Sequence, residues 1–413
     1  MKKVAIIGGG VSGLSIAHCL KNRYQAKVFE AAPQPGGLIK CRRVDGNLYH
    51  VVGGHVFNSK RNDVLEWFWK FFDQEKEFVK TIRNASVFLG NPIGYPIENH
   101  IYQLAAELQK SIISDLISIA RNEGKKPANF EEFLKFRFGN TLYNIYFKPY
   151  NEKIWKCDLS AIPLDWLEGK LPMPTVEEII LNNFRKEKEM NMVHSSFYYA
   201  KRNGSQFLAD RLAENLNIVY NAEITHIGRS KDNAGWVVND EVFDMVIYTG
   251  NVKLLPDIFS SISFSNDSKS ALSNLESHGT TSVLCRIEKN PYSWIYMPDK
   301  RHLSHRIICT GNFSDTNNAE GVTSATIEFT DFVEQDVIME NLERIPYMPQ
   351  YIAHQYTPYT YPVQTSDTRM TIQGIKDHLE KQNIYLLGRF AEWEYYNMDA
   401  AMGAAIDLSK RIL

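Results

Sequence analysis

The residues best suited to chemistry lie within the first 30 positions of the chain. Gly8, Gly10 and Gly13 follow the G-x-G-x-x-G spacing and come directly after the apolar run 4–7. Such a loop lets the backbone approach a pyrophosphate closely, and the helix behind it offers free N–H groups and a positive dipole end. Glu30 ends the next apolar step, where a carboxylate can bind both hydroxyls of an adenosine ribose. This combination predicts a dinucleotide-binding βαβ unit.

A second glycine pair, Gly36-Gly37, follows Glu30 and lets another loop approach the same ligand. A nicotinamide dehydrogenase would have no need of this pair. The continuation resembles the flavoprotein family of amine oxidases, phytoene desaturases and UDP-galactopyranose mutases. This resemblance favours FAD as the cofactor.

Composition and charge exclude several classes of protein. The 413 residues suit two or three subdomains, and 46 basic residues nearly balance 48 acidic ones, so neither a nucleic-acid partner nor a membrane surface is indicated. No apolar run of 18 residues predicts a membrane span, and the first strand follows Met1 too closely for a signal peptide. The five cysteines lack C-x-x-C spacing, so we predict reduced thiols in a cytoplasmic protein and no metal site.

A candidate cofactor contact follows a predicted strand pair at 41–57, whose turn is Asp45-Gly46. The second strand leads to Gly53, Gly54 and His55. Two glycines beside a histidine suggest a backbone pressed against a large flat group, which in a flavoprotein is the isoalloxazine ring. The alternative is a histidine that simply satisfies a buried carbonyl.

The order of apolar patterns predicts an α/β fold, with a Rossmann-like FAD-binding domain, an inserted helical domain and an antiparallel β-sheet domain. The cofactor domain is expected to be discontinuous, because strand patterns return after a long helical block. We predict the cofactor domain at 1–80, 200–252 and 380–413, the helical domain at 100–195, and the antiparallel sheet at 81–99 and 253–379.

Six blocks in order along the chain resemble the UDP-galactopyranose mutase family. They are VGGHVF (52–57), YPIENHI (95–101), FKPYNEKIW (147–155), SWIYMPDKRHLSHR (293–306), TYPVQT (360–365) and GRFAEWEYYNMDAAMGAA (388–405). The resemblance runs essentially from end to end. It implies a flavin-dependent isomerase that interconverts pyranose and furanose forms of a nucleotide-activated sugar, UDP-galactose or a close analogue, in cell-surface polysaccharide biosynthesis.

The same resemblance implies a mechanism and partners. Reduced FAD would form an adduct with the sugar through N5, displace the nucleoside diphosphate and allow the ring to contract. NAD(P)H is the expected reductant, and a homodimer is an allowed assembly. The rival class is an FAD-dependent amine oxidase or desaturase, which shares the glycine loops but needs an apolar tunnel. A non-catalytic FAD-binding relative is a third reading.

The resemblance also assigns residues. His55 would lie near the reactive edge of the flavin, with Arg306 as the second catalytic residue, and Ile224 would bring backbone close to the adenine. The full cofactor set is Gly8, Gly10, Ser12, Gly13, Glu30, Gly37, Leu38, Gly54, His55, Ile224, Gly388, Arg389, Asn397, Met398 and Asp399. The substrate set is Lys170, Tyr296, Arg306, Tyr361 and Tyr395.

The substrate set makes physical sense for a departing diphosphate. Growing negative charge on the leaving group is stabilised by an arginine fork and by phenol donors, more in the transition state than in the ground state. On local sequence alone, Arg306 could equally be a solvated strand arginine, and the tyrosines half-buried strand aromatics. Lys170 stands where the family has a second arginine and keeps the charge without the planar fork, so another nucleotide sugar is an alternative substrate. Loop closure over the substrate is expected at 121–129 or 170–195.

Overall fold

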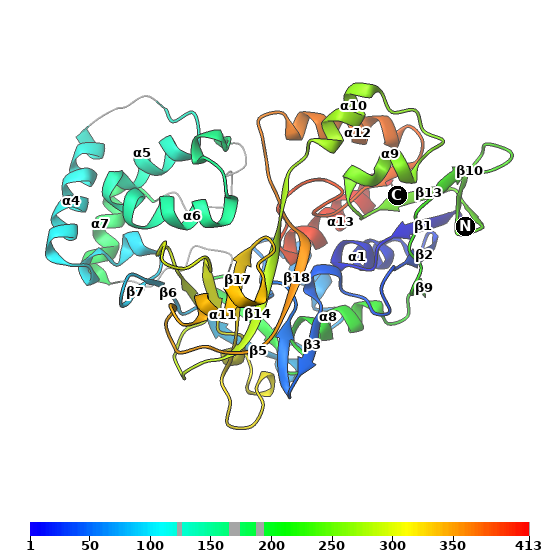
Figure 1. Ribbon diagram of the computed structural model, residues 1–413. Helices are drawn as coiled ribbons and strands as arrows, with labels where there is room; N and C mark the ends of the chain where they lie inside the picture. Colours follow the sequence, from blue (N-terminus) through cyan, green and yellow to red (C-terminus); the bar gives the residue numbers. More distant parts are fainter. Residues whose placement is uncertain (122–125, 165–173, 187–193, 413) are drawn as a thin grey trace.

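The computed structural model describes residues 1–121, 126–164, 174–186 and 194–412. Figure 1 shows two lobes above a shared antiparallel sheet. The helices α4 to α7 form one lobe, and the parallel sheet with both chain termini forms the other. Lys170 and parts of both predicted closing loops lie outside the described residues.

A five-stranded parallel sheet forms the core of the second lobe, in the order β19-β13-β1-β2-β9. Its strands are short and almost wholly apolar, as expected where helices cover both faces. They are β1 Lys3–Ile7, β2 Gln25–Phe29, β9 Ile218–Val219, β13 Met245–Tyr248 and β19 Ile384–Leu386. One face carries α1 (Val11–Leu20) and α13 (Met398–Ile412), which pack against each other. The predicted return of the chain to its first sheet is therefore present.

The other face of this sheet carries helices where the sequence predicts strands. The helices α9 (Leu255–Ile258), α10 (Asn266–Ser273) and α12 (Thr368–Glu380) share one apolar core with β1, β13 and β19. Residues 253–276 and 368–379 thus pack with the parallel sheet, although the sequence assigns them to the antiparallel sheet. The error arises because Asn, Asp and Ser, which are read as turn residues, here cap and start short helices such as α10, whose N-cap is Ser265.

The antiparallel domain is a seven-stranded sheet with the order β18-β14-β17-β16-β15-β6-β7. All neighbours are antiparallel except β6 and β15, which run parallel. The strands are β6 Ala85–Phe88, β7 Pro92–Gly94, β14 Ser277–Arg286, β15 Trp294–Tyr296, β16 Arg306–Ile308, β17 Ser324–Thr330 and β18 Gln350–Pro362, with α11 at Gln335–Leu342. The sheet gathers segments from before and after the helical lobe, as predicted for 81–99 and the later strands.

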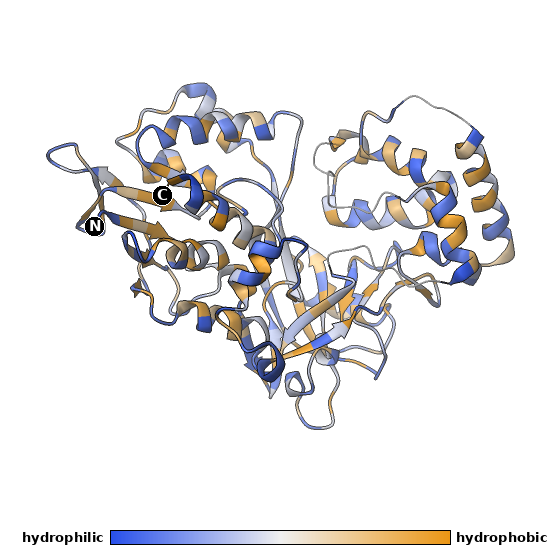
Figure 2. Cartoon of the chain, turned by 180° about the vertical axis from the view of Figure 1, so that it is seen from behind, coloured by the Kyte–Doolittle hydropathy of each residue, from blue (hydrophilic) through white to orange (hydrophobic). Residues whose placement is uncertain are grey.

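The helical lobe contains α4 (Ala106–Arg121), α5 (Phe130–Leu142), α6 (Lys148–Trp155) and α7 (Val176–Arg185). Its helices show apolar and polar residues on different faces (Figure 2). The side chain of Asn129 accepts a hydrogen bond from Glu132 N at 2.9 Å and so caps the N-terminus of α5. Gly139 interrupts the helix with φ of 82° rather than ending it.

Smaller elements connect these units. They are β3 Cys41–Val44, β4 Asn47–His50, α2 Asn62–Phe68, α3 Gln74–Glu77, β5 Phe78–Ile82 paired with β8 Ser196–Ala200, α8 Gly204–Ala213, and the sheet of β10 Ile227–Arg229, β11 Trp236–Val238 and β12 Glu241–Phe243. The predicted Asp45-Gly46 turn joins β3 to β4. Short 3₁₀ turns occur at Gly37–Ile39, Ile97–Asn99, Ile101–Gln103, Leu159–Ala161, Val252–Leu254, Thr310–Asn312 and Asp315–Asn317, and a π turn at Tyr143–Phe147.

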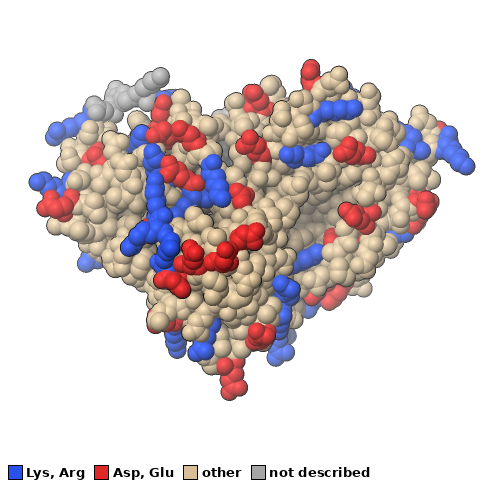
Figure 3. Space-filling model, viewed as in Figure 1, with Lys and Arg blue, Asp and Glu red and all other residues tan. Residues whose placement is uncertain are grey.

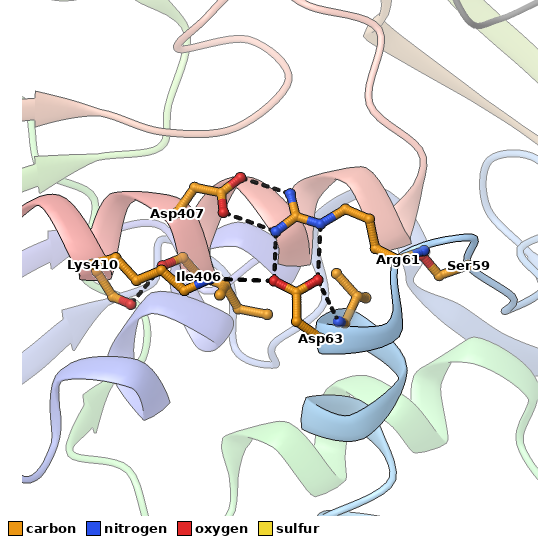
Figure 4. Close-up of polar contacts among 8 residues, drawn as sticks. Ser59, Arg61, Asp63, Ile406, Asp407 and Lys410 are labelled. Carbon is orange, nitrogen blue, oxygen red and sulfur yellow. Dashed lines mark hydrogen bonds and ion pairs between the residues drawn. The ribbon is translucent and has the colours of Figure 1, made fainter.

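An ion-pair cluster fixes the last helix beside α2 (Figure 4). Arg61 lies 2.6 Å from an oxygen of Asp407 and 2.7 Å from one of Asp63, and Lys410 lies 3.3 Å from Asp63. The hydrogen bonds from Arg61 hold the pKa of Asp63 well below its usual range. These groups are solvent-exposed, so each pair contributes little stability alone. Together they fix the direction of α13, whose N-terminus faces the pocket described below.

All five cysteines are free thiols, and Cys41, Cys285 and Cys309 are buried. Among the described residues, no helix has both the length and the apolar character needed to cross a bilayer.

Candidate functional site

The first glycine loop brings α1 unusually close to β1. A Cβ atom at Gly13 would lie only 2.0 Å from the carbonyl oxygen of Gly8, so only glycine fits at this position. Gly8 N also donates to Phe29 O at 2.8 Å, which joins the loop to β2. The N-terminus of α1 therefore faces the ends of both strands, as in a phosphate-binding turn.

Glu30 lies at the end of β2 with its carboxylate held by backbone donors. Its oxygens accept hydrogen bonds from Gly9 N at 2.6 Å and from Ala32 N at 3.0 Å, and Lys40 Nζ lies 3.5 Å away. A carboxylate offers about four lone-pair positions, so acceptor capacity remains for ribose hydroxyls. The side chain is oriented before any ligand binds.

The second glycine loop packs directly on the first. Gly36 N donates to Gly9 O at 2.9 Å. A Cβ atom at Gly37, whose φ is +54°, would lie 3.2 Å from Gly10 Cα. The two loops form a continuous backbone surface, because neither carries a side chain at the contact.

These loops open onto one pocket of about 820 Å³, including its mouth. The predicted residues that line the pocket are Gly8, Gly10, Ser12, Glu30, Gly37, Leu38, His55, Arg389, Asn397 and Met398. It is also lined by Val11, Gly36, Ile39, Thr249, Phe390, Tyr396 and Ala401, which the predicted set omits. Most of these residues could have been included from sequence, because they are adjacent in the chain to a predicted residue.

Five predicted cofactor residues do not line the pocket. Gly13 and Gly54 serve close packing, since a Cβ atom at Gly54 would lie 2.4 Å from a methyl of Ile308 in β16. Gly388, with φ of 102°, similarly leaves room for Ser12, whose Oγ would be 2.6 Å from an added Cβ. These three glycines do not line the pocket but allow the segments around it to pack closely.

The other two predicted cofactor residues that do not line the pocket are Ile224 and Asp399. Ile224 packs against the apolar core under the parallel sheet, while the nearby Ala222 N donates to Glu30 O at 2.9 Å. Asp399 begins α13 next to Ser59, and burial raises the pKa of its carboxyl. Both lie beside pocket residues without lining the pocket.

His55 presents a neutral ring to the pocket. Burial, together with the positive charge of Arg389, lowers the pKa of His55 to about 4. Its Nε2 lies 3.0 Å from Leu38 O. The backbone of Val52 is a second hydrogen-bond partner of the ring, so the single N–H of neutral His55 can serve one of two carbonyl acceptors.

Arg389 organises the segment that leads into α13. It donates from Nε to Tyr396 O at 3.0 Å and from Nη1 to Thr360 O at 3.0 Å. Its guanidinium also lies 4.9 Å from the centre of the Tyr395 ring. Arg389 therefore fixes Tyr395 and Tyr396 by its planar donor geometry.

A second polar cluster, the socket, consists of Arg306, Tyr361 and Tyr395. Arg306 Nη2 donates to Tyr361 OH at 2.7 Å, and the rings of Tyr361 and Tyr395 stack 5.6 Å apart at 11°. Burial raises the pKa of Tyr361 above its usual range, so its phenol keeps the proton. With Arg389 beneath Tyr395, contacts run without a break from the socket to the pocket.

Tyr296 joins the socket through the strand register. It lies directly opposite Arg306 in the β15–β16 pair, and opposed residues share a face of the sheet. Its hydroxyl accepts a hydrogen bond from Arg83, and its ring packs against Tyr95 and Tyr150 at 4.7 and 5.4 Å. The structure thus brings together every predicted substrate residue except Lys170, which lies outside the described residues.

Two charged residues near the socket were missed from sequence. Glu328 is fully buried in β17 and binds Arg306. The signal in the sequence was a single charged residue in a strand that otherwise contains only apolar residues, Ser and Thr. Lys153 in α6 donates to Met297 O and Ser304 O, both at 2.9 Å, and so anchors the hairpin between Tyr296 and Arg306. Lys153 lies in the block 147–155 that resembles the family, but the sequence analysis gave this lysine no role.

The surface around the site is hollowed between the two lobes (Figure 3). Lys and Arg are mixed with Asp and Glu across this face, without a large patch of one sign. Inside the site, Arg306 and Arg389 supply positive charge that could attract a phosphate.

Comparison with known proteins shows which folds and sequences this chain is similar to. A family profile for NAD(P)-binding Rossmann-like domains matches residues 6–74. The crystal structure of reduced UDP-galactopyranose mutase superposes with a TM-score of 0.87 at 22% identity, covering 100% of this chain and 94% of that one. The predicted fold class is confirmed.

Sequence relatives point in two directions. dTDP-fucopyranose mutase of Escherichia coli is 31% identical over 185 residues, which cover 42% of this chain and 46% of that protein. Coproporphyrinogen III oxidase of Staphylococcus aureus is 25% identical over 288 residues, or 60% of each chain. Both matches span less than two thirds of the relative's length. The resemblance to the UDP-galactopyranose mutase family is confirmed, for the fold over the whole chain and for the sequence over part of it.

Proposed function

We propose that this protein is a flavin-dependent mutase that interconverts the pyranose and furanose forms of a nucleotide-activated sugar. The observation that carries the proposal is the unbroken series of contacts from Arg389, which lines the pocket together with His55, through Tyr395 and Tyr361 to Arg306 in the socket. A cofactor and a leaving diphosphate could thus act on one sugar between them.

The pocket suits FAD by its shape and donor set. The two glycine loops leave backbone surface where a Cβ atom would intrude, the α1 terminus can take the pyrophosphate, and Glu30 can take the ribose. The neutral ring of His55 and the start of α13, at Asn397 and Met398, would hold the flavin end. When bound and reduced, FAD supplies a nucleophile that these side chains lack.

The side chains of the socket would bind and stabilise the diphosphate. Within the described parts of the chain, Arg306 uses Nε for Glu328 and Nη2 for Tyr361, and Nη1 makes no hydrogen bond. A phosphate oxygen could accept from Nη1 and from the hydroxyl groups of Tyr361 and Tyr395. These donors gain strength as the sugar–phosphate bond breaks and negative charge grows.

The sugar is proposed to be galactose or a 6-deoxyhexose on UDP or dTDP, since a dTDP-fucopyranose mutase is among the relatives. NAD(P)H is the proposed reductant and the cytoplasm the proposed location, with a role in making furanose sugars for surface polysaccharides. A homodimer remains a prediction.

The test is direct. Reduced holoprotein is incubated without oxygen with UDP-galactose and with dTDP-fucose in separate reactions, and products are separated by chromatography and identified by NMR. We expect a furanose from at least one donor, and much less of it from R306K, which keeps the charge but loses the fork. No furanose from either donor would refute the proposal.

The second candidate is an FAD-dependent oxidase, because a coproporphyrinogen III oxidase matches over 60% of the chain. An oxidase of an apolar substrate has no need of the Arg306–Glu328 pair or of the stacked phenols, whereas the carboxylates of a porphyrinogen could bind an arginine. Oxygen consumption with a porphyrinogen or amine, without nucleotide binding, would favour this candidate.

A further inference from the structure

A row of polar side chains crosses the antiparallel sheet at the site. Strand register places Ser282 opposite Glu328, Glu328 opposite Arg306, and Arg306 opposite Tyr296. Directly opposed residues point to the same face, so this row runs under the socket. Glu328 is its one acidic member and is fully buried.

Glu328 has partners on two separate parts of the site. One oxygen accepts a hydrogen bond from Gly53 N at 2.8 Å, and the other accepts from Arg306 Nε. His305 Nε2 also lies 3.6 Å from the carboxylate. Burial by itself would raise the pKa of Glu328, but the charge of Arg306 and the nearby ring of His305 hold it below its usual range. The carboxylate is therefore ionised.

Gly53 belongs to the turn that carries His55. Its φ of +66° suits glycine, and its N–H donates to Glu328. Two residues after Gly53, the ring of His55 is hydrogen-bonded to Leu38 O. A single carboxylate thus fixes both the turn at the pocket and the guanidinium at the socket.

We propose that Glu328 is a positioning residue that couples occupancy of the diphosphate socket to the state of the cofactor pocket. The inference rests on the proposed function. A buried carboxylate cannot release one partner without a large cost, so a shift of Arg306 toward a phosphate alters how strongly Glu328 holds Gly53. By linkage, a change at the flavin face must alter diphosphate affinity to the same extent.

The test measures the affinity of holoprotein for UDP and for dTDP in the oxidised and reduced states, by anaerobic calorimetry. For wild type we expect the two states to differ at least fivefold in dissociation constant for the better nucleotide. In E328Q, which keeps the shape but loses the charge, we expect the ratio to fall below twofold.

A second variant separates charge from reach. E328D keeps the charge, but its shorter side chain cannot hold Gly53 and Arg306 together. We expect E328D to bind the nucleotide within about threefold of wild type in the oxidised state, with the oxidised-to-reduced ratio again below twofold. E328D also keeps the test informative if E328Q fails to fold.

The matched control is E77Q, which breaks the Glu77–Arg211 ion pair of 2.8 Å between residues that line neither the pocket nor the socket. We expect its ratio to equal that of wild type, even if its melting temperature falls. A wild-type ratio near one, or ratios in E328Q and E328D equal to that of wild type, would overturn the positioning role. Failure of wild type to bind either nucleotide in both states would instead refute the proposed function itself.

Discussion

Replacement of Tyr361 by phenylalanine removes one hydroxyl and little else from the socket. The ring would keep its stacking on Tyr395, 5.6 Å away, and its edge contact with Trp155 at 6.3 Å. What is lost is the acceptor for Arg306 Nη2 at 2.7 Å and a donor aimed at the leaving phosphate. Y361F is therefore a test of hydrogen bonding rather than of packing.

The magnitude follows from the type of bond. Hydrogen bonds to charged groups contribute about 1.5–3 kcal/mol, and about 2 kcal/mol corresponds to roughly 30-fold in rate. Because the developing charge is larger in the transition state, we expect most of this loss in kcat. Protein stability should change by only about 1 kcal/mol, since Arg306 still has Glu328 as a partner.

The assay follows conversion of furanose to pyranose by chromatography, with reduced enzyme at several substrate concentrations. The control is Y359F, two residues earlier in β18, where the side chain is 46% exposed and lies outside the socket. A fall in kcat/KM of less than threefold for Y361F, or an equal fall for Y359F, would refute the assigned role of the phenol.

Three further predictions concern other parts of the site. G13A places a methyl group against Gly8 O, so the purified variant should lack flavin absorbance, whereas G374A, at an open position, should retain it. K153M removes the anchor of the β15–β16 hairpin and should weaken UDP binding about tenfold by calorimetry, without loss of bound flavin. Because burial lowers the pKa of His55 to about 4 from 6.5, the unfolded chain binds the extra proton between these values. Stability should therefore fall as pH drops from 6.5 toward 4. Urea denaturation should give a shallower fall for H55N, and equal slopes would contradict the assignment.

Sequence alone predicts the features that depend on neighbours in the chain. The glycine loops, Glu30 and the Asp45-Gly46 turn follow from local backbone rules, and the structure contains each of them. The resemblance to a known family brought in Arg306 and Tyr361, which lie far apart in sequence and meet at 2.7 Å. No periodicity in the chain could have paired them.

The features that sequence reasoning missed depend on register between distant strands. Glu328 contacts both parts of the site only because β17 pairs with β16 and because Gly53, 275 residues earlier, donates a hydrogen bond to the same carboxylate. Lys153 is similar, since its partners lie on the β15–β16 hairpin of another domain. The helices α9 and α10, of four and eight residues, were missed because short helices lack a long apolar period. The helix α12 does carry such a period, at Ile372, Ile375 and Leu379, and was overlooked.

The parallel sheet has a consequence for how the protein matures. Its central strand β1 pairs with β13, with Val4 opposite Met245, and β13 pairs with β19, with Val246 opposite Ile384. Strands that are neighbours in the sheet are therefore synthesised at very different times. Closing such long loops is entropically costly and slow. Because Arg389 and Met398 also form a wall of the pocket, the cofactor cannot be enclosed until almost the whole chain has left the ribosome. Flavin capture should therefore be one of the last events in folding, and apoprotein should accumulate when flavin is scarce.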